Sequence, residues 1–248
     1  MTDKRNWTRK LTPGPIRKFQ RYLRDKKVTE TFQPLSNAEA FDKIYADGLW
    51  GENMDKKSMF FSGEGSHINV VVDTYVSNVE TFLENNQNIK TAADLGCGDF
   101  NVGRQICKKF DEYHAVDVSR LVVEQNKKAF KFKGLKFHNL SITTDSLPEA
   151  DVAFVRQVLQ HLSNDDIKRF LKNIDGKYRF LILTETLSAS WRFIANKDIV
   201  TGPGVRFHKK SGVVLTKPPF NLEAYSETEL CRATVGKEQI VTTVFGLQ

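Results

Sequence analysis

The chain of 248 residues contains little cysteine and no long apolar run. Its three cysteines, Cys97, Cys107 and Cys231, show no C-x-x-C spacing, so neither a disulfide framework nor a zinc site is expected. No stretch of about 18 apolar residues is present to span a membrane. The N-terminus is polar and basic, unlike a signal peptide with its apolar core. These absences favour a soluble, cytoplasmic protein without a bound metal.

The excess of positive charge lies at the N-terminus. Residues 1–30 hold ten Lys or Arg against three acidic residues, which equals the net charge of +7 for the whole chain. Helical spacing between basic residues predicts a short basic amphipathic helix, with Ile16, Phe19, Tyr22 and Leu23 on its apolar side. Such a helix can dock on the rest of the protein or bind a partner subunit, a phosphorylated substrate, nucleic acid or the surface of a membrane.

The composition and the order of motifs suggest one folded domain with an appendage. We expect a basic arm over 1–34 and a folded domain over 35–248. The domain divides into a helical cap over 35–88 and a core over 89–248. A chain of this length can bury a substantial core.

A glycine turn directly follows the apolar segment TAADL. Gly96 and Gly98 lack a Cβ, so the backbone can turn sharply there and approach a ligand closely. Val102, Ile106 and Phe110 follow at four-residue spacing and predict a helix just beyond the turn. Strand, glycine turn and helix together form a nucleotide-binding unit.

A second acidic signal follows the turn. Asp117 ends the next predicted strand, 23 residues after Asp94, where an acidic residue typically binds the ribose hydroxyls of an adenosine cofactor. A dinucleotide fingerprint needs a third glycine, but the residue three positions after Gly98 is Asn101. The spelling Asp-Leu-Gly-Cys-Gly instead resembles motif I of class I methyltransferases, which use S-adenosylmethionine. Most such motifs carry another glycine where this chain has Phe100.

Strands and helices alternate from Thr91 onward, which indicates a parallel sheet covered on both faces. The predicted strands cover 92–95, 114–118, 134–140, 151–157, 179–185 and 240–247. Helices are predicted over 37–47, 67–83, from 102 onward, over 121–130 and over 165–173. Ligands of such sheets bind at the carboxyl ends of the strands.

From Phe41 to Phe220 the chain resembles class I methyltransferases found among bacterial small-molecule and surface-glycan enzymes. The shared pattern is F-D-x-I-Y-x-x-G-x-W-G at 41–51, S-G-x-G-S at 62–66, D-L-G-C-G-D at 94–99, LPEADVAFVRQVLQHLS at 147–163 and P-P-F at 218–220. The resemblance implies an α/β, Rossmann-like fold with a mostly parallel seven-stranded sheet, helices on both faces and an N-terminal helical cap. It also implies S-adenosylmethionine as cofactor and S-adenosylhomocysteine as product.

The resemblance assigns roles to residues around the turn. The backbone of the turn would line the methionine part of the cofactor, Asp117 would accept the ribose hydroxyls, and Val118 would cover the adenine. Asp94 would orient the turn or meet the ammonium group. The full expected cofactor set is Ser62, Gly63, Asp94, Gly96, Cys97, Gly98, Asp117, Val118, Ser141, Arg156 and Gln157. Asp145 is the alternative to Ser141 for the adenine amine, and an internal salt bridge is the alternative role of Arg156.

The acceptor side is less well marked. His161 is the foremost candidate for a general base, because imidazole titrates near neutrality and QHLS follows the fourth core strand. A structural role for His161, at a predicted helix start next to Leu162, is slightly favoured over a catalytic one, and His67 or Glu185 could replace it as base. The expected acceptor-binding residues are Tyr45, Trp50, His67, Glu185, Arg206, His208 and Phe220. Basic residues around 206–217 favour an anionic acceptor such as a sugar phosphate.

Three hypotheses follow. The first is O-methylation of a small molecule, a sugar or a glycan-type acceptor, with N-methylation less favoured because no Asn- or Asp-Pro-Pro-aromatic tetrapeptide follows the fourth core strand. The second is an RNA methyltransferase that uses the basic arm, although nucleic acid is not the favoured partner. The third is a binding protein that has lost turnover. The oligomeric state is left open.

Overall fold

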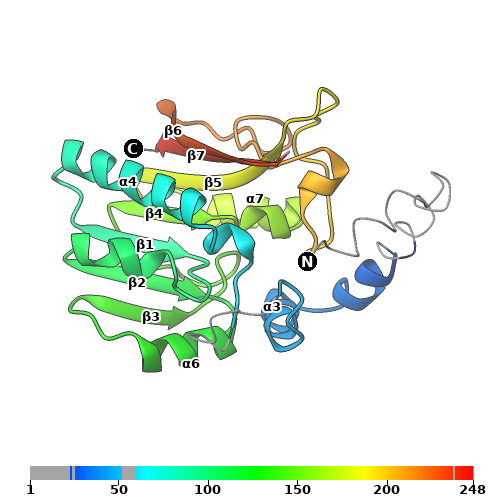
Figure 1. The fold of residues 1–248 in the computed structure, drawn as a ribbon, viewed down its shortest axis with the longest axis horizontal. Helices are drawn as coiled ribbons and strands as arrows, with labels where there is room; N and C mark the ends of the chain where they lie inside the picture. Colours follow the sequence, from blue (N-terminus) through cyan, green and yellow to red (C-terminus); the bar gives the residue numbers. More distant parts are fainter. Residues whose placement is uncertain (1–22, 24–25, 52–59, 237, 248) are drawn as a thin grey trace, which may run out of the picture.

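The computed structural model describes residue 23 and residues 26–51, 60–236 and 238–247. Their centre is a seven-stranded sheet of order β3-β2-β1-β4-β5-β7-β6 (Figure 1). Its strands are β1 (Thr91–Leu95), β2 (Glu112–Asp117), β3 (Leu135–Asn139), β4 (Val152–Arg156), β5 (Phe180–Ser188), β6 (Ser226–Val235) and β7 (Glu238–Gly246). The first five strands run parallel, and β7 is antiparallel to both β5 and β6. The predicted Rossmann-like fold is confirmed.

The helices match the expected positions with one difference. They are α3 (Asn37–Ala46), α4 (Asn69–Asn85), α5 (Gly103–Ile106), α6 (Arg120–Ala129) and α7 (Asn164–Ile174). Short 3-10 turns occur at η1 (Glu64–Ser66), η2 (Cys107–Lys109), η3 (Leu159–His161) and η4 (Arg206–Lys209). The helix expected from Val102 onward is a single turn followed by η2, because the chain must reach the start of β2 at Glu112. Within the described residues, no helix combines the length and apolarity needed to cross a membrane.

Strand β6 is absent from the sequence prediction. It lies at the edge of the sheet, and its sequence SETELCRATV mixes charged and small residues without an apolar run. The charged pair Arg232–Glu229 stays on its exposed surface. Pairing with β7 along its length therefore makes this segment a strand, where local pattern gives little signal.

Two apolar cores cover the two faces of the sheet. Alternate residues of β4 point to opposite faces, so Ala153 and Val155 join one core while Val152 and Phe154 join the other. Helix α7 packs on the first face, where residues of α3 extend the same core, and α4 with α5 packs on the second. The three cysteines are free thiols.

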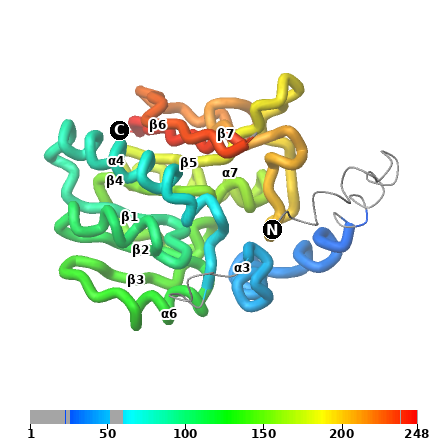
Figure 2. The backbone as a smooth tube through the Cα atoms, in the orientation of Figure 1, coloured from blue at the N-terminus to red at the C-terminus, as the bar shows by residue number. Residues whose placement is uncertain are grey.

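Helix α3 of the predicted cap lies beyond the carboxyl ends of the parallel strands, whereas α4, which the same predicted cap includes, packs on a face of the sheet (Figure 1). Helix α3 begins with a capping box between Ser36 and Glu39, and it is tied to α7 by a hydrogen bond from Asn37 to Asp166. In Figure 2 this cap and the segment around residues 200–210 lie at the same end of the sheet. Most of the basic arm, and with it most of the predicted basic helix, lies outside the described residues.

Phe100 adopts a left-handed backbone conformation, with φ of 61°. The chain thus keeps the conformation that a glycine would adopt here, although a bulky residue in that region costs about 1–3 kcal/mol. The ring is fully buried and contacts Phe137 and Phe130, with centroid distances of 5.0 and 5.2 Å. A Cβ on Gly103 would lie 2.4 Å from this ring. Phe100 and Gly103 therefore form a matched pair, in which the glycine leaves room for the ring.

Because packing outweighs strain at this position, Phe100→Gly should lower the free energy of unfolding. Loss of a buried aromatic side chain costs about 3–5 kcal/mol, and relief of strain returns about 1–3 kcal/mol. The control is Lys210→Gly, since Lys210 has φ of 56° but an exposed side chain, and this variant should gain stability. Urea denaturation measures both changes. Stabilisation by Phe100→Gly would contradict the account.

Candidate functional site

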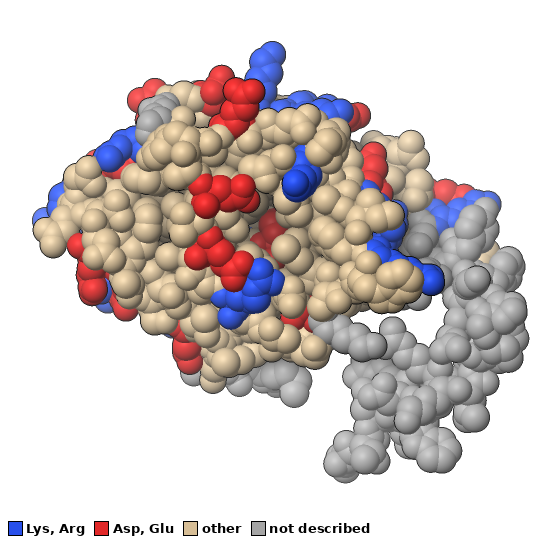
Figure 3. Space-filling view, turned by 90° about the horizontal axis from the view of Figure 1, so that it is seen from above, with Lys and Arg blue, Asp and Glu red and all other residues tan. Residues whose placement is uncertain are grey.

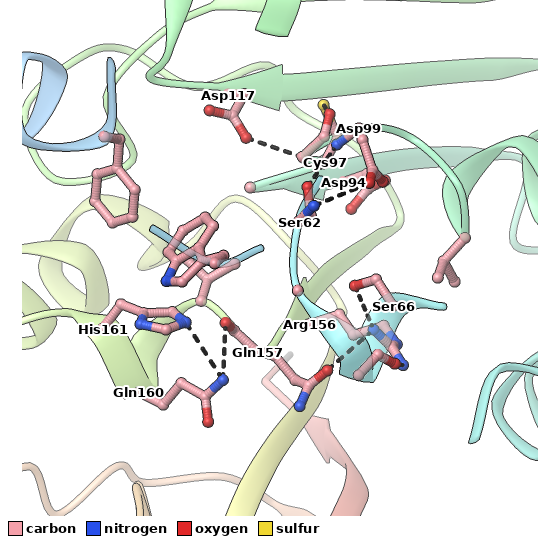
Figure 4. Close-up of a pocket in the computed structure, with 18 of the residues that line it drawn as sticks. Ser62, Ser66, Asp94, Cys97, Asp99, Asp117, Arg156, Gln157, Gln160 and His161 are labelled. Atoms are coloured by element: carbon pink, nitrogen blue, oxygen red, sulfur yellow. Dashed lines mark hydrogen bonds between the residues drawn. The ribbon is translucent and has the colours of Figure 1, made fainter. Parts of the chain in front are cut away.

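A cavity of about 410 Å³ lies at the carboxyl ends of β1, β2 and β4 (Figure 4). All eleven residues expected to bind the cofactor line it. So do Tyr45, Trp50, His161 and His208 from the expected catalytic and acceptor sets. The topology explains this convergence, because parallel strands bring their carboxyl ends to one edge of the sheet.

The glycine turn is tightly surrounded. Gly98 has φ of +54°, and a Cβ there would lie 2.4 Å from the Ser62 hydroxyl oxygen. Gly96 has φ of +91°, and its Cβ would meet Val158 at 2.4 Å. Both positions therefore require glycine for conformation and for space.

Asp117 ends β2 with its carboxylate on the turn. One oxygen accepts a hydrogen bond from the N–H of Gly98 at 2.9 Å, and the other accepts from the N–H of Ser119 at 2.9 Å. Burial raises the pKa of Asp117 to about 6, against the lowering effect of these two N–H groups. A carboxylate has about four acceptor positions, so it can still receive the hydroxyls of a ribose.

The loop over 60–67 is docked on the turn through Asp99. The N–H of Ser62 donates to the Asp99 carboxylate at 3.0 Å, and the Ser62 hydroxyl accepts from the N–H of Asp99 at 2.8 Å. His67 contacts the same carboxylate oxygen at 2.6 Å. The Tyr45 hydroxyl lies 3.0 Å from that of Ser62 and links the cap to this loop.

Arg156 fastens the other end of the loop. Its guanidinium donates to the Gly65 carbonyl at 2.6 Å, to the Ser66 hydroxyl at 3.1 Å and to the Gln157 side chain at 3.2 Å. Its Nε is buried and has no hydrogen-bond partner within the described residues. These bonds hold the loop in place, and no carboxylate takes part in them, so they are not the alternative salt bridge.

Two acidic residues frame the rest of the cofactor region. Asp94 lies beneath the turn and accepts a hydrogen bond from Tyr113 at 3.0 Å, and burial raises the pKa of Asp94 to about 7. Asp145 accepts from the N–H of Ser141 at 2.8 Å, and it does not line the cavity. Asp145 thus stabilises a turn, and Ser141 is the residue at the cavity wall.

His161 lies in the cavity wall beside Trp50, with 4.7 Å between the ring centroids. Its Nδ1 is 3.1 Å from the Gly204 carbonyl, so Nδ1 carries the proton and Nε2 has the free electron pair. The Gln160 amide lies 3.4 Å from that Nε2 (Figure 4). Burial lowers the pKa of His161 to about 4, so the ring is neutral at pH 7.

Four expected acceptor residues do not line the cavity, which corrects the sequence interpretation. His67 is held by Asp99 and stacks on Phe61. Arg206 is fully buried and donates to main-chain carbonyls, and Glu185 is 3% exposed behind η3. Phe220 packs against the core of the α3 face. Charge and position in the chain suggested these residues, but the side chain of each makes its contacts with other parts of the protein.

The sequence interpretation missed several wall residues. Phe41 and Leu49 of the cap, Gln160 of η3 and Phe207 of η4 line the cavity without having been proposed. Gln160 was the most accessible to prediction, because it directly precedes His161. In the part of the chain that the structure describes, no group of three or more His, Cys, Asp or Glu side chains is arranged to hold a metal ion.

Comparison with known proteins agrees with this site. Residues 93–177 match a family model described as a methyltransferase domain. No curated protein matches the chain in sequence.

Solved structures share the fold at low identity. Human N-acetylserotonin methyltransferase with bound S-adenosylmethionine is 14% identical, with a TM-score of 0.55 over 89% of this chain and 62% of that one. This chain thus spans less than two thirds of the human enzyme. An S-adenosylmethionine-dependent methyltransferase from Leishmania major is 12% identical, with a TM-score of 0.52 over 74% of this chain and 76% of that one. The N-methyltransferase NodS from Bradyrhizobium japonicum, in complex with S-adenosylhomocysteine, is 12% identical, with a TM-score of 0.50 over 69% of this chain and 85% of that one.

The glycine turn, the acidic end of β2 and the matched domain are features that class I methyltransferases share. Residues 93–177 are thus similar to a methyltransferase domain, and two of the structures that share the fold hold S-adenosylmethionine or S-adenosylhomocysteine.

Affinity for S-adenosylhomocysteine should depend on the ionisation of Asp117. Because its pKa is about 6, the carboxyl is protonated below that pH and loses acceptor positions for the ribose. The affinity should fall by up to about tenfold per pH unit below pH 6. Calorimetry from pH 5 to 8 measures this.

The variant Asp117→Asn distinguishes the titration of Asp117 from that of Asp94, which has a pKa of about 7. The variant should bind weakly at every pH, with a flat profile between pH 5 and 6. A profile in Asp117→Asn as steep as that of the natural chain would assign the effect to Asp94 and contradict the prediction.

Proposed function

We propose that the protein transfers a methyl group to a hydroxyl of a small molecule, a sugar or a glycan-type acceptor. The observation that carries this proposal is the neutral His161 in the cavity wall beside Trp50, whose unprotonated Nε2 lies 3.4 Å from the amide of Gln160, another wall residue. In this proposal the eleven predicted cofactor residues hold the methyl donor. Tyr45, Trp50 and His208 contact the acceptor.

The chemistry asks little of the protein beyond alignment. The sulfonium already activates the methyl group, so transfer is an in-line displacement that needs a positioned nucleophile and exclusion of water. A hydroxyl acceptor would donate its proton to Nε2 of His161 as the oxygen–carbon bond forms. With a pKa of about 4, this imidazole is a weak base whose first role is to orient the hydroxyl.

We propose an uncharged acceptor in place of the anionic one that the basic residues favoured. Arg206 is turned into the fold, and Lys209, Lys210 and Lys217 do not line the cavity. Among the described residues, Arg156 is the one basic residue of the Lys or Arg type in the cavity wall. Five acidic residues line the same wall: Glu64, Asp94, Asp99, Asp117 and Glu238. The face in Figure 3 carries both signs of charge, with acidic side chains beside its central hollow.

The division of the chain and the two alternative acceptors are also proposals. We retain the arm over 1–34 and the domain over 35–248, with the cap over 35–88. An N-methylated acceptor is less favoured because Arg156 and Gln157 occupy the place of the amino-methylase tetrapeptide. RNA methylation would need the basic arm, which is largely outside the described residues.

Methyl transfer should be detected with labelled S-adenosylmethionine and paired acceptors, each sugar or phenol tested beside its phosphate ester. Label should enter the neutral member of a pair. His161→Gln should lower kcat by about 10²-fold or more while affinity for S-adenosylhomocysteine stays within about twofold. Label found only in RNA, and lost on removal of residues 1–34, would replace this proposal with the RNA hypothesis. Unchanged kcat in His161→Gln would remove the base role.

A further inference from the structure

Two ionisable residues lie behind His161 and take no part in the cavity wall. Glu185, near the end of β5, is 3% exposed, and Arg206, in η4, is fully buried. Burying charged groups is costly unless hydrogen bonds satisfy them, so their contacts indicate what they stabilise.

Glu185 holds the start of η3. One carboxylate oxygen accepts a hydrogen bond from the N–H of Leu159 at 3.0 Å, and the N–H of Gln160 also acts on this carboxylate. The other oxygen, Oε2, is buried without a hydrogen-bond partner within the described chain. A buried oxygen without a hydrogen-bond partner is destabilising, so stability alone does not account for an acid here.

Arg206 holds the same turn from the other side. Its Nη1 donates to the Leu159 carbonyl at 2.8 Å, while Nη2 and Nε donate to Asn164 and to the Lys197 carbonyl. The segment that leads to Arg206 also grips His161 directly. The N–H of Gly202 donates to the His161 carbonyl at 3.0 Å, and the Gly204 carbonyl is the partner of Nδ1.

We propose that Glu185 and Arg206 are positioning residues that hold the turn Leu159–His161, so that His161 keeps its proton on Nδ1 and presents Nε2 to the acceptor. This inference rests on the proposed function, which gives Nε2 its role toward the acceptor hydroxyl. Glu185 acts on the N–H of Leu159, Arg206 acts on its carbonyl, and the imidazole two residues later follows the turn. Burial raises the pKa of Glu185 to about 8 and lowers that of Arg206 to about 10, and each residue acts against the shift of the other.

The tautomer of His161 can be measured without any acceptor. The ¹⁵N shifts of ring nitrogens distinguish N–H from bare nitrogen, and the chain has only five histidines, so loss of one signal set in His161→Gln assigns it. The full-length protein should show His161 as a single neutral tautomer protonated on Nδ1 at pH 7.

Two variants of Glu185 distinguish the position of its accepting oxygen from the presence of an acid group. Glu185→Gln keeps an oxygen within reach of the Leu159 N–H and should leave the tautomer of His161 unchanged. Glu185→Asp keeps a carboxyl group but withdraws it from the Leu159 N–H by one methylene, and it should give a mixture of tautomers. The structural control is Asp151→Ala, which removes hydrogen bonds to the main chain at Lys90 and Thr91, at the opposite end of the sheet, and should lower Tm without changing the His161 signals.

Arg206→Lys keeps a positive charge and removes the bond from Nη1 to the Leu159 carbonyl. It provides the same test if Glu185→Asp does not fold, and it should also give mixed tautomers. A single Nδ1–H tautomer in folded Glu185→Asp or Arg206→Lys would overturn the proposal. Mixed tautomers in Glu185→Gln would also overturn it, because the acid group, and not the position of its oxygen, would then hold the tautomer.

Turnover then distinguishes failure of this inference from failure of the proposed function. With an acceptor from the paired panel, Glu185→Asp should lower kcat by about tenfold or more, with little change in S-adenosylhomocysteine affinity. In the His161→Gln background the same substitution should have no further effect on kcat. If His161→Gln retains full kcat, the base role fails while the tautomer result still decides the positioning role.

Discussion

The cavity depends on the contact between the Asp99 carboxylate and the loop over 60–67. Asp99 follows the glycine turn, and its buried carboxylate receives Ser62 and His67. Because the Ser62 hydroxyl accepts in return from the N–H of Asp99, the loop and the turn are joined in a fixed register. Without this contact the donor site would be an open strand edge. With it, the glycine turn has a wall on both sides.

Close packing around the turn also explains its unusual sequence. The space that Gly98 leaves is filled by Ser62, and the space that Gly103 leaves is filled by Phe100. The chain accepts a strained backbone at Phe100 and again at Gln157, where φ is 56° at the end of β4. Both residues lie at the carboxyl edge of the sheet, and burial of the Phe100 ring among aromatic neighbours offsets its strain.

Electrostatics follow from the same enclosure. Burial raises the pKa of Asp94 to about 7 and that of Asp117 to about 6, so these acids titrate near neutral pH, and it lowers the pKa of His161 to about 4, so the imidazole stays neutral. A neutral imidazole and an acid-lined wall suit a cationic methyl donor. The lack of a free cation near the acceptor end, in the part of the chain described, is the physical basis for proposing an uncharged acceptor.

The sequence by itself determined the parallel sheet, the glycine turn and most of the residues that line the cavity. Apart from Ser62 and Gly63, the predicted residues lie at or just after strand ends, and parallel pairing brings strand ends together whatever the loops do. It could not reveal β6, because an edge strand with mixed polarity has no distinctive pattern. Only the tertiary structure decided that Arg206 and Glu185 face inward while Phe41 and Gln160 face the cavity. The direction of a loop side chain depends on partners far away in the chain, such as the Leu159 carbonyl that receives Arg206.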